Sequence, residues 1–326
     1  MHPAFSVIFL TTLIGVGQGL FLALFTGEVY ALAHLLPAQD SRSFYAAGSL
    51  LALAFLLAGL VASFFHLGHP ERAWRAASQW RTSWLSREVI VLPIVMALVF
   101  LYGMIHWFGW TEPLFVISGA LPVDLSLIVG LLASIAAFAL FVCTGMIYAA
   151  IKFLQEWHTA LTVVNYTVLG IASGFTLAAG FSAWMGADLV LFYGTWAVIF
   201  TALGFVTRLA AIARNAKLRP KSSLQSAIGV RHGKIVQKAQ GFMGGSFNTR
   251  EYVHGRSPGF LRGIMWWFLV LVFLVPLALL GASYGIASET LPLLAFFIQY
   301  IGLIGERWHF FADARHPQNL YYQSMA

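Results

Sequence analysis

The sequence predicts an all-α, polytopic membrane protein, and three observations support this fold class. Hydrophobic residues make up 60% of the 326 residues and charged residues only 10%, a composition that the surface of a soluble domain would not tolerate. Apolar stretches recur along the chain, several of them long enough to cross a hydrocarbon core, which takes roughly 20 helical residues. Lysine and arginine concentrate in alternate connections between these stretches. We therefore expect one integral membrane domain covering residues 1–326.

Eight membrane helices are predicted. The first, residues 4–36, lacks the basic start of a cleavable signal peptide and is too long for its apolar region, so we expect it to stay in the membrane. The second, 44–65, ends before Gly68 and Pro70, which break helices. The third, 89–108, begins after a polar run. The remaining five are apolar runs of spanning length: 125–151, 160–184, 189–212, 263–287 and 290–311.

The basic residues predict which side of the membrane each loop and terminus faces. Eight crossings place both termini on one side, together with the loops at 66–87, 152–159 and 213–262. Eighteen of the nineteen Lys and Arg residues fall on that side, and only Arg42 lies opposite. Because short loops rich in Lys and Arg stay cytoplasmic, we expect both termini to be cytoplasmic. Alternatively, part of the basic excess serves an anionic partner or lipid.

Several chemistries are disfavoured. The single cysteine, Cys143, cannot ligate an iron–sulfur cluster, and no CxxCH motif is present for covalent haem. The glycine-rich run at 15–19 lies inside the first helix without a preceding strand, so it indicates close helix packing, not a nucleotide site. A b-type haem would require two histidines to converge at bilayer depth, and His34 and His106 lie near the far surface while others lie near the cytoplasmic one. We expect neither haem nor an iron–sulfur cluster in this chain.

The most informative segment follows the second helix. It reads His66-Leu-Gly-His-Pro-Glu-Arg-Ala-Trp74, and Ser83-Trp-Leu-Ser-Arg-Glu88 then enters the third helix. We call residues 66–88 the shelf, because its arginines and tryptophans are typical anchors at the membrane surface. A quinone headgroup needs polar residues at that depth, and histidine suits proton exchange. The alternative is that the shelf holds ordinary interfacial anchors and helix caps.

The shelf resembles the corresponding loop of the DMSO reductase anchor subunit family, relatives of the NrfD-like membrane subunits of polysulfide reductase. The similarity extends over the chain, through Gly17-Gln18-Gly19, residues 241–251 and residues 306–322. The resemblance implies an eight-helix, haem-free anchor in a bacterial cytoplasmic membrane. Such an anchor holds an iron–sulfur subunit and a molybdopterin catalytic subunit and exchanges electrons with quinone, either ubiquinone or menaquinone.

The resemblance also implies site residues. The quinone-linked histidine of the family corresponds to His66, whereas His69 occupies a position that varies. We expect the quinone to be bound by His66, Arg72, Trp74, Ser86, Glu88 and Gln18. The loop at 213–262 and the C-terminal segment are the candidate docking surface for the partner subunits, through Arg219, Lys221, Arg231, Arg250, Arg256 and Arg315. A flexible basic loop near anionic lipid is the alternative.

Orientation separates the branches of the family. The familiar DMSO reductase carries its catalytic face outside the cytoplasm, whereas the basic residues here predict a cytoplasmic docking face. This departure favours the branch whose anchor serves a cytoplasmic, quinone-reducing sulfite dehydrogenase. A quinol-oxidising anchor of a DMSO, tetrathionate or polysulfide reductase remains an alternative.

Three acidic residues near or within the membrane have open roles. Glu28 in the first helix is a proton-path candidate or a hydrogen-bonded structural residue. Glu88 accepts quinone protons or pairs with Arg87, and Glu306 is expected to pair with Arg307. A proton-translocating module is the remaining functional alternative, although few ionisable residues lie near the midplane.

Overall fold

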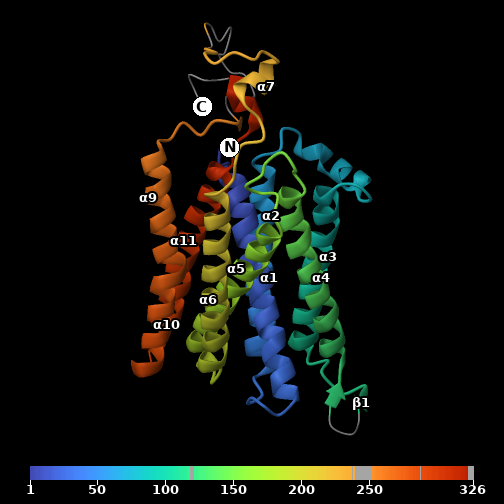
Figure 1. Ribbon diagram of the computed structural model, residues 1–326. Coiled ribbons are helices and arrows are strands. Elements are labelled where there is room, and N and C mark those ends of the chain that lie inside the picture. The colour runs from blue at the N-terminus through green and yellow to red at the C-terminus, as the bar shows by residue number, and fades with distance from the viewer. Residues whose placement is uncertain (118–120, 237, 239–250, 287, 322–326) are drawn as a thin grey trace.

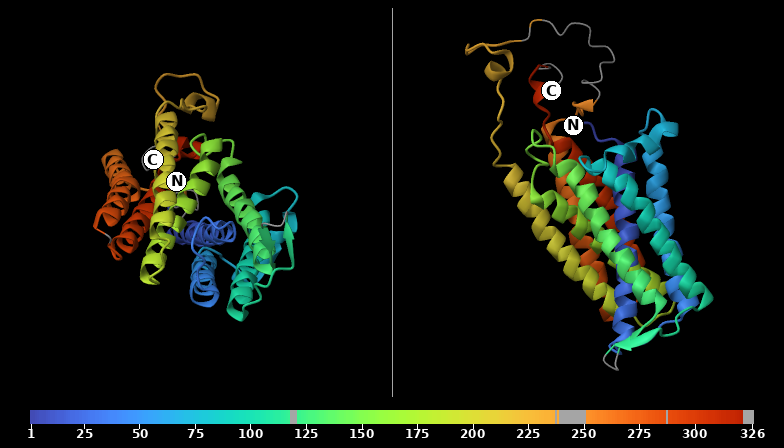
Figure 2. Two further views of the ribbon diagram at one scale, coloured as in Figure 1. Left: turned by 90° about the horizontal axis from the view of Figure 1, so that it is seen from below. Right: turned by 90° about the vertical axis from the view of Figure 1, so that its right-hand side faces the viewer.

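Long helices arranged as one bundle make up almost all of the structure (Figures 1 and 2). It is a computed structural model that describes residues 1–117, 121–236, 238, 251–286 and 288–321. Within these residues the β-structure is one short antiparallel hairpin, β1 (Phe115–Ile117) with β2 (Leu121–Val123). The predicted all-α fold class is confirmed.

Helix α1 (Phe5–Leu32) lies in the middle of the bundle, against α2 (Ala47–Phe64), α4 (Leu125–Ala149) and α5 (Ala160–Trp184). It is apolar on all sides, which suits a helix surrounded by other helices. A π-helical turn over 41–46 leads into α2. Helix α3 (Trp84–Phe108) packs against α4 and α2 at one side of the bundle.

The second half of the chain forms the other side. Helix α6 (Val190–Asn215) packs along α5, and a short helix, α7 (Leu224–Ile228), follows it. Helices α9 (Pro258–Leu269) and α10 (Val275–Ile286) are continuous through a π-helical turn at 270–274. Helix α11 (Leu291–Asp313) packs against α5, α9 and α10 and also contacts α1.

Seven helical segments in the described residues are long and apolar enough to cross a membrane: Phe5–Leu32, Ser41–Phe64, Trp84–Phe108, Leu125–Ala149, Ala160–Trp184, Val190–Asn215 and Pro258–Ile286. They correspond to the first seven predicted segments. The eighth predicted segment is α11, which has 23 residues but carries Gln299, Glu306 and Arg307. It is not among the seven, so an eighth crossing stays a prediction.

The basic connections gather at one end of the bundle, beside the N-terminus and the segment after α11 (Figure 1). The Met1 amine donates to the carbonyl of Ala314 at 2.7 Å, which ties these two segments together. Arg42 lies at the opposite end, where its side chain donates to the carbonyl of Trp107. We call the end with the basic connections the basic end and the end with Arg42 the far end. This sorting of the described basic residues is the one that the sequence predicted.

Glycines set the crossing of α1 and α5. A Cβ at Gly19 would overlap the carbonyl of Gly170, and a Cβ at Gly174 would overlap the backbone of Gly19 and Leu20. Small residues permit this close backbone approach in membrane proteins, where dispersion between helices contributes much of the packing energy. The prediction that glycines at 15–19 serve close packing is confirmed.

Candidate functional site

The shelf lies at the basic end, between α2 and α3. Helix α2 ends at Phe64, and a 3₁₀ helix begins at Pro70 and runs to Gln79. Helix α3 then starts earlier than predicted, because the Ser83 side chain caps it by accepting from the Ser86 backbone N–H. The predicted break at Gly68 and Pro70 is confirmed, and the polar run at 84–88 forms the first turn of α3.

Arginine and tryptophan side chains line the outer surface of the shelf. The Arg75 guanidinium lies 5.6 Å from the ring centre of Trp74, and that of Arg87 lies 4.2 Å from Trp84. Trp74 is 71% exposed. Such cation–π pairs at a membrane surface combine an apolar body with a charged tip, as interfacial anchoring requires.

The six residues predicted to bind quinone divide into two layers. His66, Arg72 and Trp74 are exposed on the shelf, whereas Ser86 and Glu88, at its α3 end, and Gln18 on α1 are buried among the helices. Partial burial lowers the pKa of His66, which favours the neutral imidazole. All six lie in the described part of the chain, and no hydrogen bond or ion pair joins any two of them.

Glu88 is a buried acid at the α3 end of the shelf. Its carboxylate accepts a 2.5 Å hydrogen bond from the Thr144 hydroxyl of α4. Arg87, the alternative partner, donates instead to the carbonyls of Trp80 and Arg81. The structure therefore shows Glu88 held by a hydroxyl group and not by its neighbouring arginine.

Gln18 lies on α1 between two close-packed glycines. It is 1% exposed, and its side-chain oxygen has no hydrogen-bond partner among the described residues. A buried amide oxygen without a donor costs free energy, so it is a candidate acceptor for a water molecule or a ligand hydroxyl.

The predicted docking residues belong to the segments at the basic end. Arg219, Lys221, Arg231, Arg256 and Arg315 are all exposed. Arg250 lies outside the described residues. The Glu251 carbonyl accepts from the His2 backbone N–H, and the Asn319 amide donates to the Tyr252 carbonyl at 2.9 Å. The end of the basic loop, the N-terminus and the C-terminal segment thus form one surface.

A buried charge cluster at the basic end joins α6 to α11. The Glu306 carboxylate lies 2.7 Å from the Arg208 Nε and 2.5 Å from the Arg307 Nε, and all three side chains are almost fully buried. The expected pairing of Glu306 with Arg307 is confirmed. Arg208 was not predicted as a partner, because nothing in the sequence relates residues 98 positions apart on separate helices.

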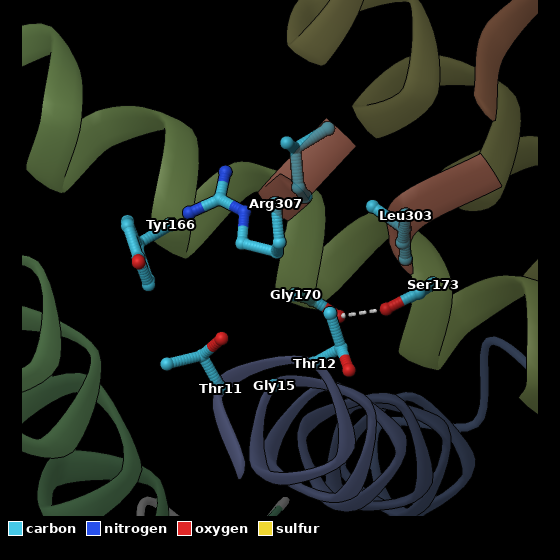
Figure 3. A pocket seen from close by; sticks show the side chains of 9 residues that line it. Thr11, Thr12, Gly15, Tyr166, Gly170, Ser173, Leu303 and Arg307 are labelled. Atoms are coloured by element: carbon cyan, nitrogen blue, oxygen red, sulfur yellow. Dashed lines mark hydrogen bonds between the residues drawn. The ribbon is translucent and has the colours of Figure 1, made fainter. Parts of the chain in front are cut away.

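A small cavity borders this cluster (Figure 3). Its volume is about 20 Å³, and the lining includes Thr11 and Thr12 of α1, Tyr166 and Ser173 of α5, and Arg307. The Arg307 guanidinium stacks 4.0 Å from the Tyr166 ring. That volume holds about one water molecule and is far below the hundreds of Å³ of a ligand pocket. We therefore do not assign quinone to this cavity.

A second buried polar cluster surrounds Glu28 at the far end. Its carboxylate accepts hydrogen bonds from the Tyr102 hydroxyl at 2.7 Å and the Ser126 hydroxyl at 2.5 Å. The His106 Nε2 lies 3.2 Å from the same carboxylate. The sequence pointed to Glu28 but not to these partners, because the partners lie on α3 and α4, which are distant in the chain.

Metal ligands do not gather in the part of the chain that the structure describes. Among these side chains, no group of three or more His, Cys, Asp or Glu could hold a metal ion.

Comparison with known proteins places the chain in a family. The family model described as DMSO reductase anchor subunit (DmsC) matches residues 1–306. The chain belongs to the DMSO reductase anchor subunit family. The resemblance seen in the shelf and in Gly17-Gln18-Gly19 is thereby confirmed. One relative is the C subunit of the sulfite dehydrogenase of Allochromatium vinosum, which is 66% identical over 326 residues, covering 100% of each chain.

Membership in the DMSO reductase anchor subunit family fits the architecture. A bundle of long apolar helices suits a membrane anchor, and the basic connections gather at one end of it.

Proposed function

We propose that this chain is the membrane anchor and quinone-binding subunit of a complex that passes electrons from sulfite to membrane quinone. The observation that carries the proposal is the full-length, 66% identity to a protein named as the C subunit of a sulfite dehydrogenase. Anchor subunits of the DMSO reductase type bind quinone. In this proposal a molybdopterin subunit oxidises sulfite, and an iron–sulfur subunit passes the electrons to the anchor.

The shelf supports the proposed quinone site. Quinone has carbonyl oxygens that accept hydrogen bonds and takes up protons when it is reduced, while its tail stays in lipid. Neutral His66 can donate a hydrogen bond at the surface, and Glu88 with Thr144 lies one layer deeper as a proton-exchanging group. Arg72 and Trp74 are exposed on the shelf as further proposed contacts, and Ser86 and Gln18 are the remaining ones.

The basic end supports the proposed docking of the partner subunits. Five exposed cations, Arg219, Lys221, Arg231, Arg256 and Arg315, belong to the basic loop and the C-terminal segment, and the ends of these two segments meet the N-terminus. Like-signed charges on one face attract an acidic partner surface and speed its association. Because this face is rich in Lys and Arg, we propose that it faces the cytoplasm of a bacterial cell.

The function can be tested on the complex purified through this chain. We expect sulfite to reduce a soluble quinone analogue, and inverted membrane vesicles to oxidise added sulfite faster than sealed right-side-out vesicles. An intact complex that contains molybdenum but ignores sulfite would instead support a quinol-oxidising reductase of DMSO, tetrathionate or polysulfide.

The site can be tested with two neighbouring histidines. His66→Ala should lower sulfite-dependent quinone reduction by about 10²-fold, the usual contribution of a proton-exchanging side chain, and leave sulfite-dependent dye reduction unchanged. His69→Ala is the matched control, because His69 is exposed in the same segment and its imidazole pairs with Glu71 at 3.1 Å. Equal quinone reduction by the two variants would remove His66 from the site.

A further inference from the structure

The cluster at the far end contains more acceptor oxygens than its hydroxyl groups can satisfy. The Ser126 Oγ lies 2.5 Å from a carboxylate oxygen of Glu28 and 2.8 Å from a carboxylate oxygen of Asp124. A serine hydroxyl carries one proton and can donate only one hydrogen bond. Two short oxygen–oxygen contacts need two protons, so one of the two carboxyl groups must carry the second.

The surroundings decide which carboxyl group is protonated. Asp124 is the N-cap of α4, and its side chain also accepts the Leu127 backbone N–H at 2.8 Å. A helix N-terminus and a backbone N–H both stabilise a negative charge, so Asp124 is held as the carboxylate. Glu28 and Asp124 are equally buried, each 5% exposed, but Glu28 lies within α1 and accepts no backbone N–H from the described residues, so its ionised form is the more costly of the two.

The other groups that face Glu28 are consistent with a neutral acid. The Tyr102 hydroxyl donates to its second oxygen, and the rings of Tyr45 and Tyr102 lie 4.9 and 4.5 Å from His106. The His106 Nδ1 lies 2.7 Å from the Ser41 hydroxyl, which can donate to it and leave a neutral imidazole with its proton on Nε2. That Nε2 lies 3.2 Å from Glu28 Oε1, and the oxygen of a protonated carboxyl group can still accept from it. Tyr193, with its hydroxyl beside Gly27, completes the titratable neighbours.

From this geometry we propose that Glu28 is a protonated carboxylic acid that donates to Ser126, which in turn donates to Asp124, forming a proton-loading site at the far end. A proton moves by transfer from Glu28 to the Ser126 oxygen while the Ser126 proton passes to Asp124, leaving Glu28 ionised and Asp124 neutral. The inference deepens the expectation that Glu28 handles protons. It stands independently of the quinone site, because its test requires no electron transfer.

The test is infrared spectroscopy of the full chain in lipid nanodiscs at neutral pH. The wild type should show the carbonyl stretch of a protonated carboxyl group, and Glu28→Gln should remove it. Glu88→Gln is the matched control, since Glu88 is a buried acid at the opposite end of the bundle, and it should leave the Glu28 band in place. If Glu28→Gln leaves the bands unchanged, or if only Asp124→Asn removes one, the proposal is wrong.

A second variant keeps the test decisive if Glu28→Gln does not fold. Ser126→Ala removes the link between the two carboxyl groups without changing either of them. The Glu28 band should then shift to higher frequency, because its hydroxyl loses the acceptor, and should exchange with deuterium more slowly. An unchanged band in Ser126→Ala would also overturn the proposal.

Discussion

Each end of the bundle holds a buried cluster of ionisable side chains, and the two clusters carry opposite charge. At the basic end, Arg208 and Arg307 surround one carboxylate, Glu306, so guanidinium groups outnumber acids. At the far end, Glu28 and Asp124 share one hydroxyl, and His106 is the basic neighbour. Arginines stay charged at all relevant pH values, whereas paired carboxyl groups can hold or release a proton.

This difference assigns different physical roles to the two clusters. Fixed guanidinium charges oppose the passage of a hydrated proton, as they do in channels that exclude protons, so the Arg208–Glu306–Arg307 cluster is best described as a link between α6 and α11. The Glu28 cluster has spare acceptors and therefore attracts protons. If the loss of one acid lowered the free energy of unfolding equally at the two clusters, their roles would not differ.

The largest expected effect is at the basic end. Glu306→Gln would leave two buried guanidinium groups without a counter-charge and should destabilise the fold by about 3–5 kcal/mol. The free energy of unfolding, from denaturant titration in mild detergent, measures it. Glu71→Gln is the control, because the Glu71–Arg72 pair is exposed and 3.6 Å long, and its loss should cost about 0–1 kcal/mol. Similar costs for the two variants would mean that Glu306 is not a structural link.

A smaller effect is expected at the far end. If Glu28 is neutral, the amide oxygen of Glu28→Gln still accepts from Tyr102, and the variant should lose only about 1–3 kcal/mol. The same unfolding measurement applies. A cost as large as that of Glu306→Gln would show that Glu28 is ionised and paired with a protonated His106, which would erase the contrast between the ends.

The sequence predicted the features that depend on local pattern. The break at Gly68 and Pro70, the glycine packing on α1 and the sorting of the basic loops all follow from composition, helix-breaking residues and charge. Helix α3 begins at Trp84 and not at the predicted Val89, because the Ser83 side chain caps it and the helix takes in the polar residues that precede the apolar run.

The partners within the buried clusters were not predictable from the sequence. A soluble helix shows which face is buried by the spacing of its apolar and polar residues. Helix α1 is apolar on all its faces apart from a few residues such as Gln18 and Glu28, so it gives no such pattern. Nothing local therefore relates Glu28 to Tyr102 and Ser126, or Glu306 to Arg208. Glu306 and Arg307 were paired correctly because they are adjacent in the chain.

The smallest expected effect concerns acid, which should loosen the basic end before the far end. Burial is the main cause of the lowered pKa values of His66, His254 and His316, all near the basic end. A histidine with a lowered folded pKa binds fewer protons folded than unfolded, so its stabilising contribution is present above the unfolded pKa of about 6.5 and is lost as pH falls through the folded value.

Acid adds positive charge to this already basic end, whereas the far end already holds a proton on Glu28. Hydrogen–deuterium exchange, corrected for the intrinsic pH dependence, should show peptides covering 251–257 and 313–321 opening below about pH 6.5 while a peptide covering 24–45 stays protected. The matched variant His316→Gln should remove part of this acid sensitivity. If the far-end peptide opened first, protons would be acting mainly on the Glu28 cluster, and the two ends would have to be assigned the other way round.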